Sequence, residues 1–591
     1  MTETITPSAP AAKTQEETTG ISERLRLHWK FLTGRILALR EDQFFLFLAV
    51  LIGVFSGLAV VCFRVAIEWT QLELLGPSLS PSITRVLLAP TIGGLVVAVL
   101  VLRVFPSSQG SGVNRTKAAV FIWDGYVPFQ TVIGKFVTCA LAIGSGQSLG
   151  PEDPSLQMGA GIASKIGRSL NLSQEKIRLI APVGAAAGLA AAFNAPISAV
   201  LFVIEEVIGV WSGGVLGAIV LAAVSSVVTM RSFLGADALF RVPEIRVVRA
   251  EDLLAYAVLG VVGGGASIAF LKWIAYARPR IERLPYWTKY LQPAAAGLLI
   301  GAIGIRLPQV MGAGYSIIDQ ALHGQFTWKL LLVLAALKIL ATGFSFLSGT
   351  PGGMFAPALF IGAMLGGAVG TVEQTIFSGL SGNVGTFALV GMGTFFAGFL
   401  RIPITSVFMV IELSGNYTAI LPVMISTMVA YFISRSFQKV PLFDMLARQD
   451  GLVLPSIEEQ REQVAPVVEK AMQRGAALVC GPSDTVTSVI SRAESKPDSP
   501  ILMHSRREWR LLDRAQLKLL AEDKSRTHTA ADADGKGPLP ILFPDLTLEE
   551  ALQVVGDWPL LPVVNRADLS KLEGIITLAD ILRAFRNTRA E

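Results

Sequence analysis

Charged residues are scarce in this chain. Only 16% of its 591 residues are Asp, Glu, Lys or Arg, and 52% are hydrophobic, whereas a soluble chain usually carries about 25% charged residues. The formal net charge of +5 is small for this length and gives no indication of a nucleic-acid partner. The composition therefore argues against an ordinary soluble protein.

Cysteine and histidine are also rare. The three cysteines, Cys62, Cys139 and Cys480, lie far apart in apolar surroundings, and the four histidines are isolated. This spacing excludes a disulfide framework and the usual metal sites. Neither a nucleophile–base set nor a phosphate-binding loop is recognisable, so we predict no enzymatic activity and no bound metal.

Long apolar runs take the place of the missing charges. Phe44–Phe63 contains no charged residue, and about 20 apolar residues suffice to cross the roughly 30 Å hydrocarbon core of a membrane. Similar runs, some with one charge, are Val86–Leu102, Val215–Thr229, Leu253–Leu271, Leu330–Leu347, Gly382–Leu400 and Ala419–Ile433. They predict a polytopic membrane protein, with a number of crossings that hydropathy alone does not fix.

The two ends of the chain differ from this apolar middle. Met1–Thr19 is polar without a signal peptide, and Ile21–Arg40 mixes five basic residues with Leu and Phe. We interpret residues 1–40 as a cytoplasmic tail with an amphipathic helix on the membrane surface; a helix packed on a soluble domain is the alternative. After Leu446 the chain becomes charged, which divides it into a membrane domain at 41–446 and a soluble domain at 463–591.

An internal repeat relates two parts of the membrane domain. Gly184–Glu206 matches Gly391–Leu413 at a constant offset (391 − 184 = 207). Upstream, Gly150–Pro154 and Gly353–Pro357 share the pattern Gly-x-x-x-Pro. Two such halves are typical of transporters and channels, but the sequence does not decide whether the repeats are inverted.

Glycine-rich breaks interrupt the apolar sequence at Gly110–Asn114, Gly144–Pro154 and Gly349–Pro357, each before a potential helix. Such breaks are tolerated inside a membrane where they are buried in protein or line a cavity. The N–H groups at several converging helix N-termini would bind an anion without a buried basic residue. Close packing between helices is the alternative explanation for any single break.

Two acids inside the membrane domain are not shared by the repeat. Glu152 corresponds to Phe355, and Glu206 corresponds to Leu413, whereas Glu205 is matched by Glu412. A carboxylate within a membrane is a functional candidate, so we select Glu152 and Glu206 and predict a structural role for the shared pair. A helix cap at Glu152 and an ion pair at Glu206 are the alternatives.

The segments Gly110–Val113, Gly150–Pro154 and Gly353–Pro357 resemble the three signature segments of the CLC chloride channel and transporter family, and the likeness extends over roughly residues 40–450. It implies an all-α, inverted-repeat membrane domain that forms a homodimer with one ion path per subunit. It implies a multi-pass protein of the cell membrane with both chain ends in the cytoplasm.

The resemblance also implies roles for individual residues. Ser111 and the backbone N–H groups of Met354 and Phe355 would bind a central chloride, Glu152 would be the gate, and Glu206 would transfer protons. An acid at position 206 is similar to the chloride/proton antiporters of the family. A passive, voltage-gated type of chloride channel is the alternative.

The chain departs from the family pattern at four positions. Pro151 replaces a basic residue, Asp153 a glycine and Asn114 a proline, and the tyrosine expected to donate a second hydroxyl to chloride is Phe443. Asp153 places a second acid beside Glu152. These departures bear on anion affinity, selectivity and coupling, and leave the predicted fold unchanged.

The soluble domain resembles a pair of CBS domains. The second copy is the clearer one, at Pro540–Phe585, and a first copy covers about 467–524. The resemblance implies an α/β fold that binds an adenine nucleotide through Thr577 and Asp580; a purely structural tail is the alternative. A membrane-tethered nucleotide sensor with a vestigial pore is therefore an alternative function, of a class other than transport.

Overall fold

The computed structural model describes residues 41–588, apart from 77–81, 171, 210–212, 241, 243–251, 377–382, 453, 456–466, 498, 506–507, 524, 534 and 557. The predicted surface helix at Ile21–Arg40 lies outside the described residues. The chain forms two compact units, Met1–Gln460 and Arg461–Glu591.

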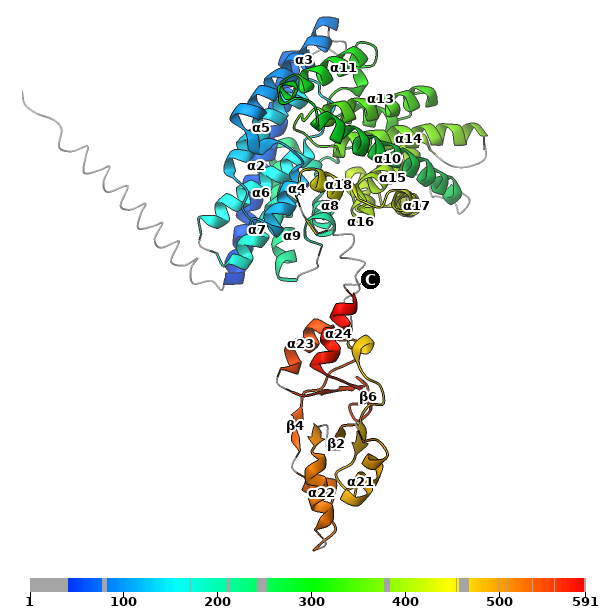
Figure 1. Ribbon diagram of the computed structural model, residues 1–591. Coiled ribbons are helices and arrows are strands. Elements are labelled where there is room, and N and C mark those ends of the chain that lie inside the picture. Colours follow the sequence, from blue (N-terminus) through cyan, green and yellow to red (C-terminus); the bar gives the residue numbers. More distant parts are fainter. Residues whose placement is uncertain are drawn as a thin grey trace, which may run out of the picture. The chain divides into compact units, whose positions relative to one another are not determined.

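The first unit is built from helices (Figure 1). Their bounds are α2 Glu41–Leu75, α3 Ile83–Val99, α4 Gly112–Phe121, α5 Phe129–Gly144, α6 Glu152–Arg168, α7 Gln174–Phe193, α8 Pro196–Phe202, α9 Gly213–Leu234, α10 Asp252–Glu282, α11 Gln292–Gly304, α12 Tyr315–Leu322, α13 Trp328–Leu347, α14 Phe355–Ile376, α15 Val384–Leu400, α16 Pro403–Ser414, α17 Ile420–Phe437 and α18 Leu442–Gln449. A π-helical turn, η3 at Val203–Ile208, extends α8.

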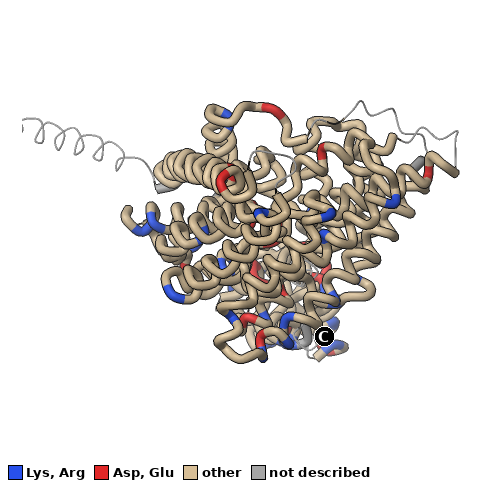
Figure 2. The backbone as a smooth tube through the Cα atoms, turned by 90° about the horizontal axis from the view of Figure 1, so that it is seen from above, with Lys and Arg blue, Asp and Glu red and all other residues tan. Residues whose placement is uncertain are grey.

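Eight helices in the described part of the chain are long and apolar enough to cross a membrane. Two of them, Lys176–Phe193 and Phe355–Ile376, are absent from the apolar runs identified in the sequence. They are also the most enclosed, with 78% and 83% of the apolar window buried, against at most 50% for the other six. Protein surrounds these two helices in place of lipid, so they need fewer large apolar residues. Figure 2 shows how sparsely charged residues are spread along the helices.

The two halves of this unit repeat the same packing. Helix α2 packs on α9 as α10 packs on α17, α6 packs on α7 as α14 packs on α15, and α7 packs on α9 as α15 packs on α17. The predicted repeat is therefore present in three dimensions as well as in the sequence (Figure 1).

Two carboxylates join the halves by capping each other's helix. Glu205, after the end of α8, accepts hydrogen bonds from Thr405 N (2.8 Å) and Thr405 Oγ1 (2.7 Å) at the start of α16. Glu412, near the end of α16, accepts from Ser198 N (2.7 Å) and Ser198 Oγ (2.5 Å) at the start of α8. Each carboxylate neutralises the positive end of the other helix. Because each helix ends where the other begins, α8 and α16 run antiparallel, as inverted repeats require.

The second unit is a small α/β structure. Its elements are α20 Val468–Ala471, β1 Leu478–Cys480, α21 Val486–Glu494, β2 Ile501–Ser505, β3 Glu508–Leu512, α22 Arg514–Glu522, β4 Lys536–Leu539, α23 Leu548–Val555, β5 Leu561–Val564, β6 Leu572–Ile576 and α24 Leu578–Thr588. One sheet has the order β1-β2-β3-β4, and the other pairs β5 with β6 in antiparallel register.

Three hydrophobic clusters lie in the described part of this unit: one around α21 and α22, one around α23 and α24, and a third that combines residues of β2, β3 and β4 with residues of β5 and β6. Each half also takes a segment from the other. Gln473, before β1, bridges to Ile575 of β6, while β4 pairs with β3. Two interlocked copies of one small fold account for this arrangement.

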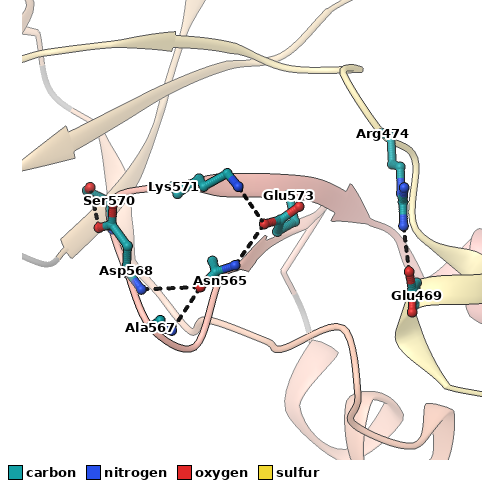
Figure 3. A network of polar contacts seen from close by, with 8 residues as sticks. All are labelled: Glu469, Arg474, Asn565, Ala567, Asp568, Ser570, Lys571 and Glu573. Carbon is teal, nitrogen blue, oxygen red and sulfur yellow. Dashed lines mark hydrogen bonds and ion pairs between the residues drawn. The ribbon is translucent and has the colours of Figure 1, made fainter.

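A polar network closes the turn between β5 and β6 (Figure 3). The Asn565 side chain donates to Glu573 Oε1 at 3.0 Å and accepts from Ala567 N at 2.8 Å. The hydrogen bond from Asn565, followed by that from Lys571, lowers the pKa of Glu573. These contacts fix the register of the hairpin.

Candidate functional site

Three helix N-termini meet in the middle of the membrane unit. Gly150, just before α6, and Gly353, just before α14, form an antiparallel bridge with two N–H···O distances of 2.8 Å. The N-terminus of α4 contacts α6 through Asp153. The three predicted breaks therefore precede helices whose unpaired N–H groups converge, and these partial positive charges favour an anion.

Glu152 is fully buried at the first residue of α6. Its Oε2 accepts a hydrogen bond from Ala356 N at 3.3 Å, and its Oε1 accepts one from the Tyr315 hydroxyl. The Glu152 carboxylate thus caps α14, in the other half of the repeat, although Glu152 itself belongs to α6. This contact explains why Gly150 is needed, since an added Cβ there would lie 2.3 Å from Glu152 Oε2.

Asp153 turns the other way. Its carboxylate accepts hydrogen bonds from Gly112 N (2.8 Å), Val113 N (3.0 Å) and Ser111 Oγ (3.2 Å). It is buried as well. Adjacent acids therefore cap two different helices, Glu152 at α14 and Asp153 at α4.

The four residues that the sequence selected for chloride binding lie around one small cavity of about 10 Å³. Ser111, Met354, Phe355 and Phe443 line it together with Asp153. The rings of Phe202 and Phe443 both contact the ring of Phe355, at centroid distances of 5.2 and 6.2 Å. The aromatic wall keeps the cavity apolar except where helix N-termini reach it.

Larger cavities also lie in this unit. A cavity of about 680 Å³ is lined by Pro151 and Tyr315, so it ends beside Glu152. Another of about 340 Å³ shares Phe346 and Gly352 with the small cavity. Since Pro151 lines the first cavity and Asp153 the small one, Glu152 stands between them along the chain.

Glu206 lies in a buried ion-pair cluster. Lys117 of α4 places its ammonium group 2.9 Å from Glu206 Oε1 and 3.2 Å from Asp444 Oδ1 of α18. All three side chains are buried. The structure thus contains the ion pair that was the alternative interpretation of Glu206, and a proton-transfer role has to operate within it.

Asn114, one of the departures from the family pattern, holds Phe443 in place. Its Nδ2 donates to the backbone oxygen of Phe443 at 2.9 Å. The side chain therefore ties α4 to α18 beside the small cavity. A proline at this position would offer no such donor.

Two residues of the site, Tyr315 and Lys117, were not predicted from the sequence. Tyr315 starts α12 after Gly314, which has a positive φ of 88°, but a tyrosine outside the signature segments gave no signal. Lys117 did give one, because a lysine within an apolar helix needs a carboxylate partner.

In the soluble unit, Thr577 and Asp580 form a cap for α24. Asp580 Oδ2 accepts from Thr577 N at 3.0 Å and Thr577 Oγ1 at 2.7 Å, and both carboxylate oxygens accept from Gln473 Nε2. Burial raises the pKa of Asp580, but the bonds from Thr577 and Gln473 lower it by more. The two predicted nucleotide-binding residues thus lie together and bond to each other.

These features define a polytopic membrane protein of two inverted repeats whose helix N-termini meet beside a small buried cavity. A sequence profile described as voltage gated chloride channel matches residues 93–435, and a CBS domain profile matches residues 536–587. The chain belongs to the voltage-gated chloride channel family, and its soluble unit contains a CBS domain.

Individual relatives agree with this membership. The chain is 32% identical to a ClcB-like chloride channel protein of Ralstonia nicotianae over 65% of this chain and 92% of that one. It is 30% identical to the H⁺/Cl⁻ exchange transporter ClcA of Vibrio campbellii over 68% and 88%. The solved structure of a slow cyanobacterial Cl⁻/H⁺ antiporter shares the fold, with a TM-score of 0.63, 24% identity, and coverage of 72% and 100%.

Proposed function

We propose that this protein exchanges chloride for protons across a membrane. The observation that carries the proposal is the Glu152 carboxylate, buried at the N-terminus of α14, whose chain neighbours Pro151 and Asp153 line two different cavities. The resemblance of the sequence to the ClcA exchange transporter supports it.

The geometry links the two ions at one place. A carboxylate and a chloride ion are both anions, and both are stabilised by the N–H groups at a helix N-terminus. When Glu152 accepts a proton it loses its charge and its hold on Ala356 N, so an anion can take its place. The charged carboxylate and chloride then alternate at the same donors, and each chloride entry is linked to proton uptake by Glu152.

The remaining features of the assembly are proposals too. A homodimer with one ion path per subunit, a cell-membrane location and cytoplasmic chain ends rest on family membership, and the orientation rests on the basic segment Arg24–Arg40. The roles proposed for Ser111, Met354, Phe355 and Phe443 are supported by the cavity that they share.

Native protein in liposomes tests the proposed exchange. An outward chloride gradient should drive protons inward against their own gradient, measured with a chloride electrode and an internal pH dye in one experiment. Liposomes without protein are the control. A chloride current whose reversal potential ignores the pH gradient would show that protons are not exchanged.

One contact favours a second candidate, passive chloride conduction. Lys117 holds Glu206 in a buried ion pair at 2.9 Å, which accounts for an acid at this position without proton transfer. If Glu206 never takes up a proton, no proton reaches Glu152 from that side. The reversal-potential measurement separates the two candidates.

For the soluble unit, we propose that an adenine nucleotide binds where Asp580 now bonds to Gln473. Ribose hydroxyls would have to replace Gln473 as donors to the carboxylate.

Thermal unfolding tests this nucleotide site. ATP or AMP should raise the Tm of native protein, and Asp580→Ala should abolish the shift. Gln473→Ala, which frees the carboxylate, should enlarge it. If ATP and AMP leave all three proteins unchanged, the tail is structural.

A further inference from the structure

Asp153 accepts hydrogen bonds from donors that would otherwise be available to chloride at the small cavity. Its carboxylate accepts from the Ser111 hydroxyl, Gly112 N and Val113 N. Ser111 and Asp153 both line the small cavity, and Gly112 and Val113 follow Ser111 at the N-terminus of α4. A carboxylate of the chain thus occupies donors that a mobile anion would use.

The surrounding backbone is shaped to admit this carboxylate. An added Cβ at Gly112 would lie 2.5 Å from the Asp153 backbone oxygen, and one at Gly353 would lie 2.9 Å from Asp153 Cβ. Glycine at both positions lets α4, α6 and α14 approach closely enough for the bonds to form. The contact is therefore part of the packing of all three helices.

The alternative donors around the cavity are few. Phe443 has no hydroxyl, and the Ser111 hydroxyl is already used by Asp153. The N–H groups of Met354 and Phe355 at the start of α14 remain for an anion, and Glu152 competes for the same helix end. Chloride therefore meets a carboxylate at each of the two helix N-termini.

We infer that Asp153 is a specificity-determining residue: its carboxylate is a tethered competitor that lowers the affinity of the central site for chloride. The inference rests on the proposed function and deepens it. A tethered group acts at an effective concentration of about millimolar or higher, so chloride must displace it before using Ser111. Removing the carboxylate should tighten chloride binding by about tenfold or more, since a tenfold change in Kd corresponds to only about 1.4 kcal/mol.

The test uses full-length protein in detergent, with Tm measured in sodium chloride and in sodium gluconate. Asp153→Gly removes the cap of α4 and empties the site, so its Tm in gluconate should fall and chloride should restore it. Asp153→Asn keeps a neutral oxygen near Gly112 N, so its chloride-dependent shift should lie between those of Asp153→Gly and native protein. Chloride titration should give the lowest Kd for Asp153→Gly, an intermediate Kd for Asp153→Asn and the highest Kd for native protein.

Glu412→Gln is the matched control. Glu412 also accepts from one serine hydroxyl and from two backbone N–H groups at a helix N-terminus, but the residues described around the small cavity include none from α8 or α16. This variant should lose Tm in both salts, and chloride should not restore it. Chloride rescue of Glu412→Gln to the same extent would mean a general salt effect and overturn the inference.

Other outcomes separate this inference from the proposed exchange. If the Asp153 variants bind chloride no more tightly than native protein while native liposomes couple chloride to protons, only the role of Asp153 fails. If native liposomes move neither ion while Asp153→Gly binds chloride more tightly, the tethered competitor stands and the proposed exchange fails.

Discussion

Replacing Glu152 with glutamine should abolish chloride-driven proton transport while chloride flux persists. Glutamine has the shape of the protonated acid but carries no charge, so it cannot hold the N-terminus of α14 against an anion as the carboxylate does. The flux should also lose its dependence on pH. Chloride efflux and internal pH from liposomes, measured between pH 4.5 and 7.5, are the readouts, the range being set by roughly the pKa of an ordinary Glu and neutrality.

Glu68→Gln is the control for this variant. Glu68 lines the same 680 Å³ cavity as Tyr315, so the change removes a carboxylate from the wall without touching the α14 N-terminus. It should transport both ions as native protein does. If Glu152→Gln instead keeps a strict pH dependence, another group carries the proton, and Asp153 is the first to test.

Replacing Lys117 with methionine should destabilise the folded protein severely. The substitution leaves Glu206 and Asp444 buried next to each other without the ammonium group that bonds to both. Breaking a buried ion pair from one side costs about 3–5 kcal/mol. Thermal and denaturant unfolding in detergent, followed by tryptophan fluorescence, measure the loss.

A second change should reverse part of this loss. Lys117→Met combined with Glu206→Gln removes one charge of each sign, so the double variant should be more stable than Lys117→Met alone. Lys135→Met is the control, because its ammonium donates to the backbone oxygen of Gly110 at 2.8 Å; it should cost less. If Glu206→Gln gives no recovery, the two residues are not energetically coupled.

The same double variant addresses proton transfer. If Glu206 relays protons, liposomes with Lys117→Met/Glu206→Gln should carry chloride without protons. Proton movement equal to that of native protein would assign Glu206 a structural role only.

The repeat could be detected in the sequence because helix starts and helix caps require particular residue types at fixed positions. Pro196 and Pro403 each begin a helix, and the shared Glu205 and Glu412 each cap the other's helix. A cap needs an acid at a set distance from a helix end, so the pattern survives as a constant offset. The three breaks before α4, α6 and α14 were equally visible, since glycine marks where chains approach closely.

The partners of the selected acids were harder to predict. Tyr315 lies 163 residues from Glu152, and Lys117 lies 327 residues from Asp444. Such contacts depend on how whole helices pack, which no local pattern encodes. The direction of Asp153 was also hidden, because two adjacent acids at the start of one helix look alike in sequence and yet cap different helices.

The reciprocal caps of α8 and α16 also set an order of events during synthesis. Glu205 is made about 200 residues before Thr405, its hydrogen-bond donor. At roughly 5–20 residues per second, a ribosome needs about 10–40 s to reach that donor. For that interval the Glu205 carboxylate lies at its helix end without Thr405, in or beside the bilayer where a carboxylate is costly. The first half therefore cannot complete its structure alone, and insertion of the second half is the step at which both halves become stable.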